Sequence, residues 1–123
     1  LVDDAETIRK KVMKAVTDSG PTVPDSVKPE AVENLFTMLK IVSSPDTYDY
    51  FNEKYNRCEI RYGDLKKQLA EDIIQFTAPI RERILEISAD VAYMDKVVAR
   101  GAEKARESAS QTMKEVRKIV GFK

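Results

Sequence analysis

Between Tyr62 and Asp90, apolar side chains recur every three or four residues, and this spacing is the strongest constraint on the fold. The positions are Leu65, Leu69, Ile73, Phe76, Ile80, Ile84 and Ile87. Such steps place all of them on one face of an α-helix, whereas a strand would need steps of two. At 1.5 Å per residue the helix is roughly 40 Å long, so other helices are expected to pack along it. Asp64 is the expected N-cap, and Pro79 predicts a kink.

Five further helices are predicted at residues 4–17, 29–43, 45–55, 91–100 and 102–120. Asp3 or Asp4 caps the first of them, and Ser44, followed by a proline and an acid, opens the third. Asp90 caps the fourth, and Gly101 is expected to end it as a C′ glycine. The predicted fold class is therefore all-α, a bundle of five or six helices with one long, proline-kinked central helix.

Two helical faces allow more than one interpretation. An aromatic face is formed by Tyr48, Phe51 and Tyr55. It either belongs to the core or stacks on bases, and helical spacing favours the core. In the last helix, an alanine face lies opposite a polar row. The alanine face is Ala102, Ala105 and Ala109, continued by Met113, Val116 and Val120, and the row is Arg100, Lys104, Gln111 and Lys118.

The overall charge and residue types exclude several function classes. Basic and acidic residues number 21 each, so net charge points to neither nucleic acid nor membrane, although residues 100–123 hold seven basic against three acidic residues. The chain has no histidine and a single cysteine, Cys58. A histidine base, a histidine-ligated metal and an internal disulfide are thereby excluded. With no apolar run of transmembrane length and no signal peptide, a cytoplasmic location without membrane association is expected.

Residues alone predict neither a catalytic nor a metal site. The neighbouring carboxylates Glu71 and Asp72 diverge around a helix, which is unsuited to a shared metal or an acid–base pair. A lone linker thiol such as Cys58 is usually inert. The 123 residues thus suggest one all-α domain with a basic terminal helix.

Several motifs in series resemble bacterial tryptophanyl-tRNA synthetase. They are AVTDS at 15–19, KP at 28–29 before an Asn-Leu helix, YGDLKKQLAE at 62–71, PIRER at 79–83 and GAEKAR at 101–106. The resemblance covers essentially the whole chain but only the C-terminal part of that enzyme, after its Lys-Met-Ser-Lys-Ser loop. Glu30 and Glu33 occupy positions where the family usually has a glycine and a serine. Residues 58–61 replace the glycine-rich segment that commonly precedes the Tyr-Gly pair.

This resemblance implies a class I aminoacyl-tRNA synthetase whose catalytic dinucleotide-fold domain lies outside residues 1–123. That domain would bind tryptophan and ATP with magnesium and charge tRNA, in a cytoplasmic homodimer where one tRNA reaches across both subunits. This fragment is then expected to hold no catalytic residue and no cofactor, and to contact the anticodon arm.

Eight basic residues are the candidate tRNA contacts, by motif position or by their place on the exposed row. They are Lys66, Lys67, Arg81, Arg83, Arg100, Lys104, Arg106 and Lys118. For Arg83, a salt bridge that holds a neighbouring helix is an equally weighted alternative. For the whole chain, the alternative function is a helical protein-interaction module without nucleic-acid binding.

Overall fold

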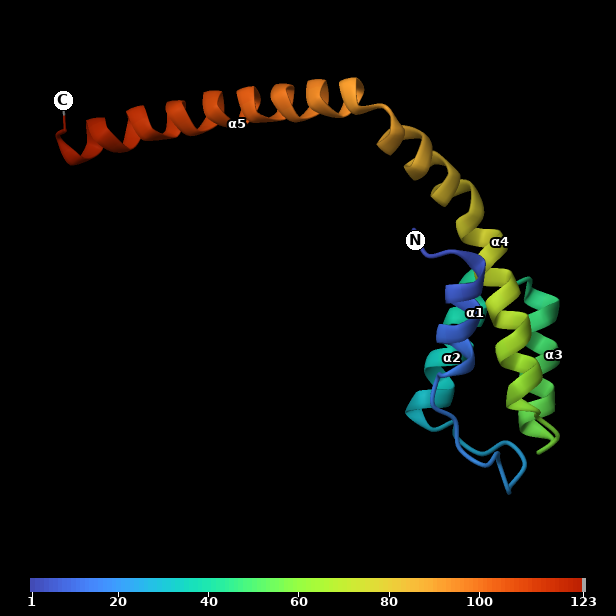
Figure 1. Ribbon diagram of the computed structural model, residues 1–123. Helices are drawn as coiled ribbons and strands as arrows, with labels where there is room; N and C mark the ends of the chain where they lie inside the picture. Colours follow the sequence, from blue (N-terminus) through green and yellow to red (C-terminus); the bar gives the residue numbers. More distant parts are fainter. Residues whose placement is uncertain (123) are drawn as a thin grey trace. The chain divides into compact units, whose positions relative to one another are not determined.

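The computed structural model describes residues 1–122, which contain five α-helices and no strand (Figure 1). The helices are α1 (Ala5–Met13), α2 (Glu30–Val42), α3 (Pro45–Asn56), α4 (Tyr62–Ala89) and α5 (Val91–Val120). The predicted all-α class and the helix count are therefore confirmed. The chain divides into two compact units, Leu1–Glu82 and Arg83–Lys123, which we call the bundle unit and the terminal unit. Helix α4 contributes residues to both.

The core of the bundle unit is built from α1, α2, α3 and the first part of α4, which lie side by side in Figure 1. Its buried members are Val12, Val32, Leu35, Phe36, Leu39, Phe51, Tyr55, Leu65, Leu69 and Ala70. The Phe36 ring meets the rings of Tyr48 and Tyr55 edge to face, with centroids 5.9 and 6.1 Å apart. The aromatic face of α3 therefore belongs to the core, as predicted.

Three predicted helix caps are confirmed by hydrogen bonds. Asp4 Oδ1 accepts from the Thr7 amide at 2.7 Å, and Ser44 Oγ accepts from the Thr47 amide at 3.2 Å. Asp90 Oδ1 accepts from the Tyr93 amide at 2.9 Å. Each bond joins residues three apart and satisfies one amide that the first helical turn leaves free, which is why sequence alone was sufficient to find it.

Two helix starts differ from the prediction. Asp64 is not the N-cap of α4, because the helix already begins at Tyr62 and the Arg61 carbonyl oxygen accepts from the amides of Asp64 and Leu65. Asp64 instead lies in the first turn, where an acid interacts favourably with the helix dipole. Pro29 lies at the N-cap of α2 rather than inside its first turn.

Helix α1 ends four residues earlier than predicted, since the segment after it bonds to α4. Lys66 Nζ donates to Thr17 Oγ1 at 3.1 Å, and the Tyr62 hydroxyl donates to Asp18 Oδ1 at 2.7 Å. These bonds join the AVTDS and YGDLKK motifs, which are 44 and 49 residues apart at the bonded positions. The periodicity of apolar residues cannot predict hydrogen bonds between such distant residues. Because of these bonds, the segment after Met13 is not helical.

The apolar seam of α4 is buried only at its start. Leu65 and Leu69 are fully buried, whereas Phe76 is 49% exposed and Ile80 38%. Pro79 lies inside α4, which continues to Ala89, and the kink at this proline stays a prediction. Close to it, Thr77 Oγ1 donates to the Ile73 carbonyl oxygen at 2.7 Å. The expectation that helices pack along the whole seam is therefore wrong for its second half within the bundle unit.

In the terminal unit, α5 is one continuous helix of 30 residues. The prediction that Gly101 ends a helix is wrong, because a glycine costs only about 1 kcal/mol relative to alanine inside a helix and leaves its hydrogen bonds in place. The left-handed C-terminal glycine is instead Gly121, with φ of 78° and its amide bonded to the Arg117 carbonyl oxygen. No residue of α5 is buried.

Candidate nucleic-acid interface

The candidate tRNA contacts fall in both units. Lys66, Lys67 and Arg81 belong to the bundle unit, and Arg83, Arg100, Lys104, Arg106 and Lys118 to the terminal unit. Each unit is therefore considered by itself.

Of the three candidates in the bundle unit, only Lys67 presents an exposed charge without a partner in the unit. Lys66 is 9% exposed, and its ammonium group donates to Thr17. Arg81 is half-buried, and its Nε donates to the Val2 carbonyl oxygen at 3.2 Å. Lys67 is exposed on the following position of α4. Lys66 and Arg81 thus have structural partners within the unit, whereas Lys67 is available to an external anion.

Arg83 forms an ion pair within its own helix. Its Nη1 lies 2.6 Å from Glu86 Oε2, three residues further along α4, and both side chains are exposed. The hydrogen bond to Glu86, reinforced by the carboxylate charge, raises the pKa of Arg83 above its ordinary value. Arg83 therefore pairs within α4, and this pair is not the expected alternative of a salt bridge to a neighbouring helix. Exposed pairs of this kind contribute little to stability.

The basic residues of α5 lie on two sides of the helix. Arg100, Lys104, Gln111 and Lys118 are all exposed and share one side, as the sequence predicts. Arg106 follows Lys104 by two residues, which rotates it by about 200°, so these two side chains point in nearly opposite directions. Lys104 and Arg106 therefore do not face the same phosphate.

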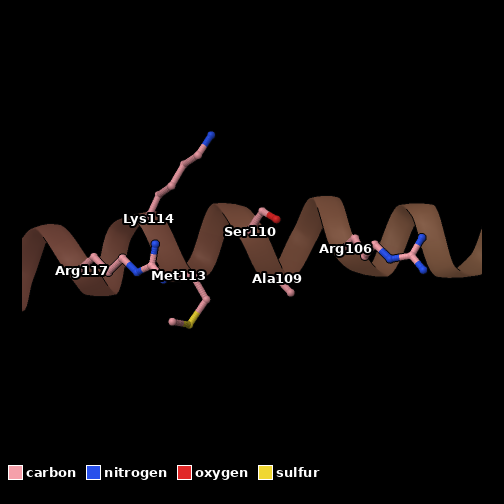
Figure 2. A pocket seen from close by; sticks show the side chains of 6 residues that line it. All are labelled: Arg106, Ala109, Ser110, Met113, Lys114 and Arg117. Carbon is pink, nitrogen blue, oxygen red and sulfur yellow. The ribbon is translucent and has the colours of Figure 1, made fainter. Parts of the chain in front are cut away.

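A second basic group, missed by the sequence analysis, lies beside Arg106. A shallow hollow on α5 is lined by Arg106, Ala109, Ser110, Met113, Lys114 and Arg117. In Figure 2 the side chains of Ser110 and Lys114 point to one side of the helix, and those of Ala109 and Met113 to the other. The spacing of Arg106, Lys114 and Arg117, at steps of eight and three, was the available signal. This group borders the apolar face of α5. The aliphatic parts of its lysine and arginine side chains can therefore also pack against that face.

Charge pairing distinguishes the two units within residues 1–122. The bundle unit holds six ion pairs, the terminal unit has the Arg83–Glu86 pair, and none is found within α5. Helix α5 nevertheless carries seven basic against four acidic residues. The basic ones are Lys96, Arg100, Lys104, Arg106, Lys114, Arg117 and Lys118. Exposed cations without an ion-pair partner are suited to bind the phosphates of a nucleic acid.

The remaining polar groups do not assemble into a reactive centre in the part of the chain that the structure describes. Glu71 and Asp72 diverge as predicted: Glu71 Oε1 meets Arg9 Nε at 2.6 Å, and Asp72 accepts from Ser43. The hydrogen bond from Arg9 holds the pKa of Glu71 below its usual value. Among residues 1–122 no cluster of three potential metal ligands occurs, and no helix has the length and apolarity to span a bilayer.

Comparison with known proteins gives consistent matches, although no family model matches the chain. It is 69% identical over 123 residues to the tryptophan–tRNA ligase of Porphyromonas gingivalis, covering 100% of this chain and 38% of that protein. Against tryptophan–tRNA ligase 1 of Streptomyces coelicolor it is 38% identical, covering 99% and 35%. A crystal structure of tryptophanyl-tRNA synthetase from Campylobacter jejuni matches with a TM-score of 0.74 and 22% identity, covering 98% of this chain and 38% of that one.

The helical fold and these matches make the chain similar to a helical region of aminoacyl-tRNA synthetases. The chain spans little more than a third of the curated relatives it matches. Within that class, it corresponds over its whole length to the C-terminal region of the tryptophan–tRNA ligases. The resemblance that the motifs indicated is thereby confirmed.

Proposed function

We propose that this chain is the tRNA-binding C-terminal domain of a tryptophan–tRNA ligase. The complete protein would charge tRNA(Trp) with tryptophan at the expense of ATP and magnesium, as a cytoplasmic homodimer, with its catalytic site outside residues 1–123. The observation that carries the proposal is the 69% identity, over the whole chain, to a protein of that name. A solved tryptophanyl-tRNA synthetase that the fold matches is complexed with ADP and tryptophan.

The contact with tRNA is assigned to exposed cations. Lys67 of α4 and the basic residues of α5 would neutralise phosphates, with lysine as a mobile charge and arginine able to fork onto a phosphate or stack on a base. The exposure of these side chains, and the lack of ion pairs within α5 among the described residues, support this role. Lys66 and Arg81 would act indirectly, by fixing the bundle unit.

Charge reversal in the complete enzyme tests the proposal. The double variant Lys104→Glu, Arg106→Glu should raise the KM for tRNA, by about tenfold if one phosphate contact contributes roughly 1.4 kcal/mol. Tryptophan-dependent ATP–pyrophosphate exchange should stay nearly unchanged, because that reaction needs no tRNA. Since the two residues point to opposite sides of α5, the single variants also identify which side faces tRNA. An equal loss of both activities would show that these residues are structural.

Salt dependence provides a second test on the 123-residue chain alone. Its binding to tRNA should be weak and should fall steeply as salt rises, because each phosphate contact releases counterions. The matched control is Lys10→Glu, which reverses a charge already paired with Glu6 at 2.6 Å and should leave the salt dependence unchanged. An affinity that ignores salt would contradict the proposal.

A protein-interaction module without nucleic-acid binding is the second candidate function. It is favoured by the exposed apolar residues of α5, such as Val98 at 65% and Met113 at 49%. A gel shift without tRNA binding at low salt, together with capture of a defined protein partner, would support it. The reading frame upstream of Leu1 also discriminates, since the ligase requires a His-Ile-Gly-His-type signature and a Lys-Met-Ser-Lys-Ser loop there.

A further inference from the structure

The loop of residues 14–29, between α1 and α2, places one lysine between two aromatic rings of the bundle unit. Lys28 Nζ is 4.7 Å from the centre of the Phe36 ring and 4.8 Å from that of the Tyr55 ring. It also donates a hydrogen bond to Asn52 Oδ1 at 2.8 Å. The two rings are nearly perpendicular, at an interplanar angle of 78°, and both residues are only 1% exposed. The ammonium group therefore lies in a corner formed by two buried rings.

These contacts use the whole binding capacity of an ammonium group, which has three N–H donors and no acceptor. The amide oxygen of Asn52 takes one donor, and the other two are left for the negative faces of the two rings. Lys28 is half-buried, yet no carboxylate among residues 1–122 forms an ion pair with it. Aromatic faces with one polar oxygen are the surroundings that proteins use to bind organic cations.

Two further contacts hold the same end of the loop. The Val27 carbonyl oxygen accepts from the Tyr55 hydroxyl at 3.4 Å, and the Asp25 amide donates to the Asn56 carbonyl oxygen at 3.1 Å. Together with Asn52, these partners belong to the last two turns of α3. Asp25 has φ of 55°, in the left-handed region that side chains disfavour, so its conformation depends on the contacts around it. This end of the loop is therefore held in place by α3.

The other end of the loop is attached to α4, through the hydrogen bonds of Thr17 to Lys66 and of Asp18 to Tyr62. Only residues 19–24 separate the two attached ends, and two of these six residues are prolines. Each proline fixes its own φ at about −65°, and a short connection leaves little freedom between its ends. The position of one end therefore constrains the other end, and with it the partner of Lys66.

We infer that Phe36, Tyr55 and Asn52 form a binding site for an organic cation of the primary ammonium class. The chain occupies this site with its own Lys28, and the occupied site latches loop 14–29 onto the bundle unit. The inference goes beyond the proposed function and does not rest on it. Every contact lies within the bundle unit, and the tests need no tRNA.

Two replacements of Lys28 separate the effect of charge from that of packing. Lys28→Met keeps an apolar chain of similar length without the charge, whereas Lys28→Arg keeps a charge that also binds ring faces. In the 123-residue chain, Lys28→Met should speed hydrogen exchange of the Asp25 amide by about tenfold, which corresponds to about 1.4 kcal/mol. Lys28→Arg, and the matched control Lys40→Met at an exposed position of α2, should leave this rate nearly unchanged. An unchanged rate in Lys28→Met would overturn the inference, because the side chain would then act by packing alone.

Chemical rescue tests the class of ligand directly. Lys28→Ala removes the atoms of an n-propylammonium ion from the site. Added n-propylammonium chloride should slow exchange of the Asp25 amide in this variant in proportion to its concentration, as a ligand of the closed form does. The unsubstituted chain should not respond, since Lys28 fills its site. The controls are n-propanol and sodium chloride at the same concentrations. No slowing by n-propylammonium, or equal slowing by n-propanol, would show that the site does not select a cation.

A change at the far end tests whether the latch holds the whole loop. Tyr62→Phe removes the hydrogen bond to Asp18, which lies seven residues before Asp25. If the loop opens as a unit, this variant should speed exchange of the Asp25 amide by about threefold or more. Tyr50→Phe is the matched control, because its ring is 56% exposed, and it should have no effect. An Asp25 amide that does not respond to Tyr62→Phe would overturn the latch. Equal acceleration at Asp25 and at the core residue Leu39 would also overturn it, because the loop would then open only with the whole bundle.

Discussion

Helices α2 and α5 have the same kind of amphipathic pattern, but the apolar face is buried in α2 and exposed in α5. In α2, Val32, Leu35, Phe36 and Leu39 are all at most 2% exposed, although the helix has only 13 residues. In α5, with 30 residues, not one is buried. Apolar periodicity therefore fixes which face of a helix is prepared for burial. Whether that face is buried depends on what lies against it.

Hydrogen bonds show the same contrast between the two units. Arg9 and Lys66 reach partners 62 and 49 residues away, both inside the bundle unit. The side-chain bonds of α5 are local, from Gln111 to Glu115 and from Thr112 to the Ser108 carbonyl oxygen, each across four residues. Long-range bonds stabilise one arrangement of several segments, whereas local bonds stabilise only the helix that contains them. The bundle unit should therefore unfold cooperatively, and α5 of the 123-residue chain should fray independently of it.

The largest expected effect comes from truncating one apolar residue in each unit of the 123-residue chain. Phe36 is 1% exposed and Val116 43%. Phe36→Ala should lower the free energy of unfolding by about 3 to 5 kcal/mol, through lost burial and the cavity left behind. Val116→Ala should change it by less than about 0.5 kcal/mol. Urea unfolding followed by circular dichroism measures both. Similar losses in the two variants would break the comparison.

The second-largest effect on the free energy of unfolding is expected from removing one tyrosine hydroxyl in each unit. Tyr62→Phe removes the hydrogen bond to Asp18 and should lower the free energy of unfolding by about 1.5 kcal/mol. Tyr93→Phe in α5, whose tyrosine is 51% exposed, is the matched control and should have almost no effect. Urea unfolding at neutral pH measures the difference, and equal losses in the two variants would contradict the prediction.

The pH dependence of this effect has a definite sign. Burial, and then the hydrogen bond to Asp18, raise the pKa of Tyr62 above its ordinary value of 10.0. A raised pKa means that the folded state favours the neutral phenol, so its contribution is complete below about pH 10 and is lost as pH rises further. The advantage of the unsubstituted protein over Tyr62→Phe should be constant from about pH 7 to 9 and shrink above about pH 10. A loss that begins near neutral pH would point to another titrating group.

The smallest effect concerns the continuity of α5. An added Cβ at Gly101 meets no heavy atom within 4 Å, and the residue is helical, so Gly101→Ala should stabilise α5 by about 1 kcal/mol. Gly121→Ala is the control, and it should weaken the helix end because Gly121 has φ of 78°. Hydrogen exchange of the α5 amides in the 123-residue chain measures both. A destabilising Gly101→Ala would restore the prediction of two helices separated at this glycine.

Features that depend on residues close in sequence were predictable, and features that depend on residues far apart in sequence were not. Caps at Asp4, Ser44 and Asp90 were predictable because each involves residues three apart. The burial of Lys66 was not predictable, because its partner Thr17 comes from a distant segment, and a lysine in a basic motif suggests an exposed charge. For the candidate interface, helical projection alone gave the exposed row on α5. The second group around Arg106 was missed because it borders the apolar face instead of standing opposite it.

The sequence by itself determined which segments are helical, most of their caps, the core faces of α2 and α3, and the family to which the motifs point. These depend on the period of the helix and on local hydrogen bonds, both of which are written in neighbouring residues. Only the tertiary structure decided where α1 ends, which lysine of the YGDLKK motif is buried, and that the chain divides after Glu82. Those outcomes depend on which distant side chains come into contact. The sequence around an apolar face or a lysine is the same whether a distant segment covers it or water surrounds it.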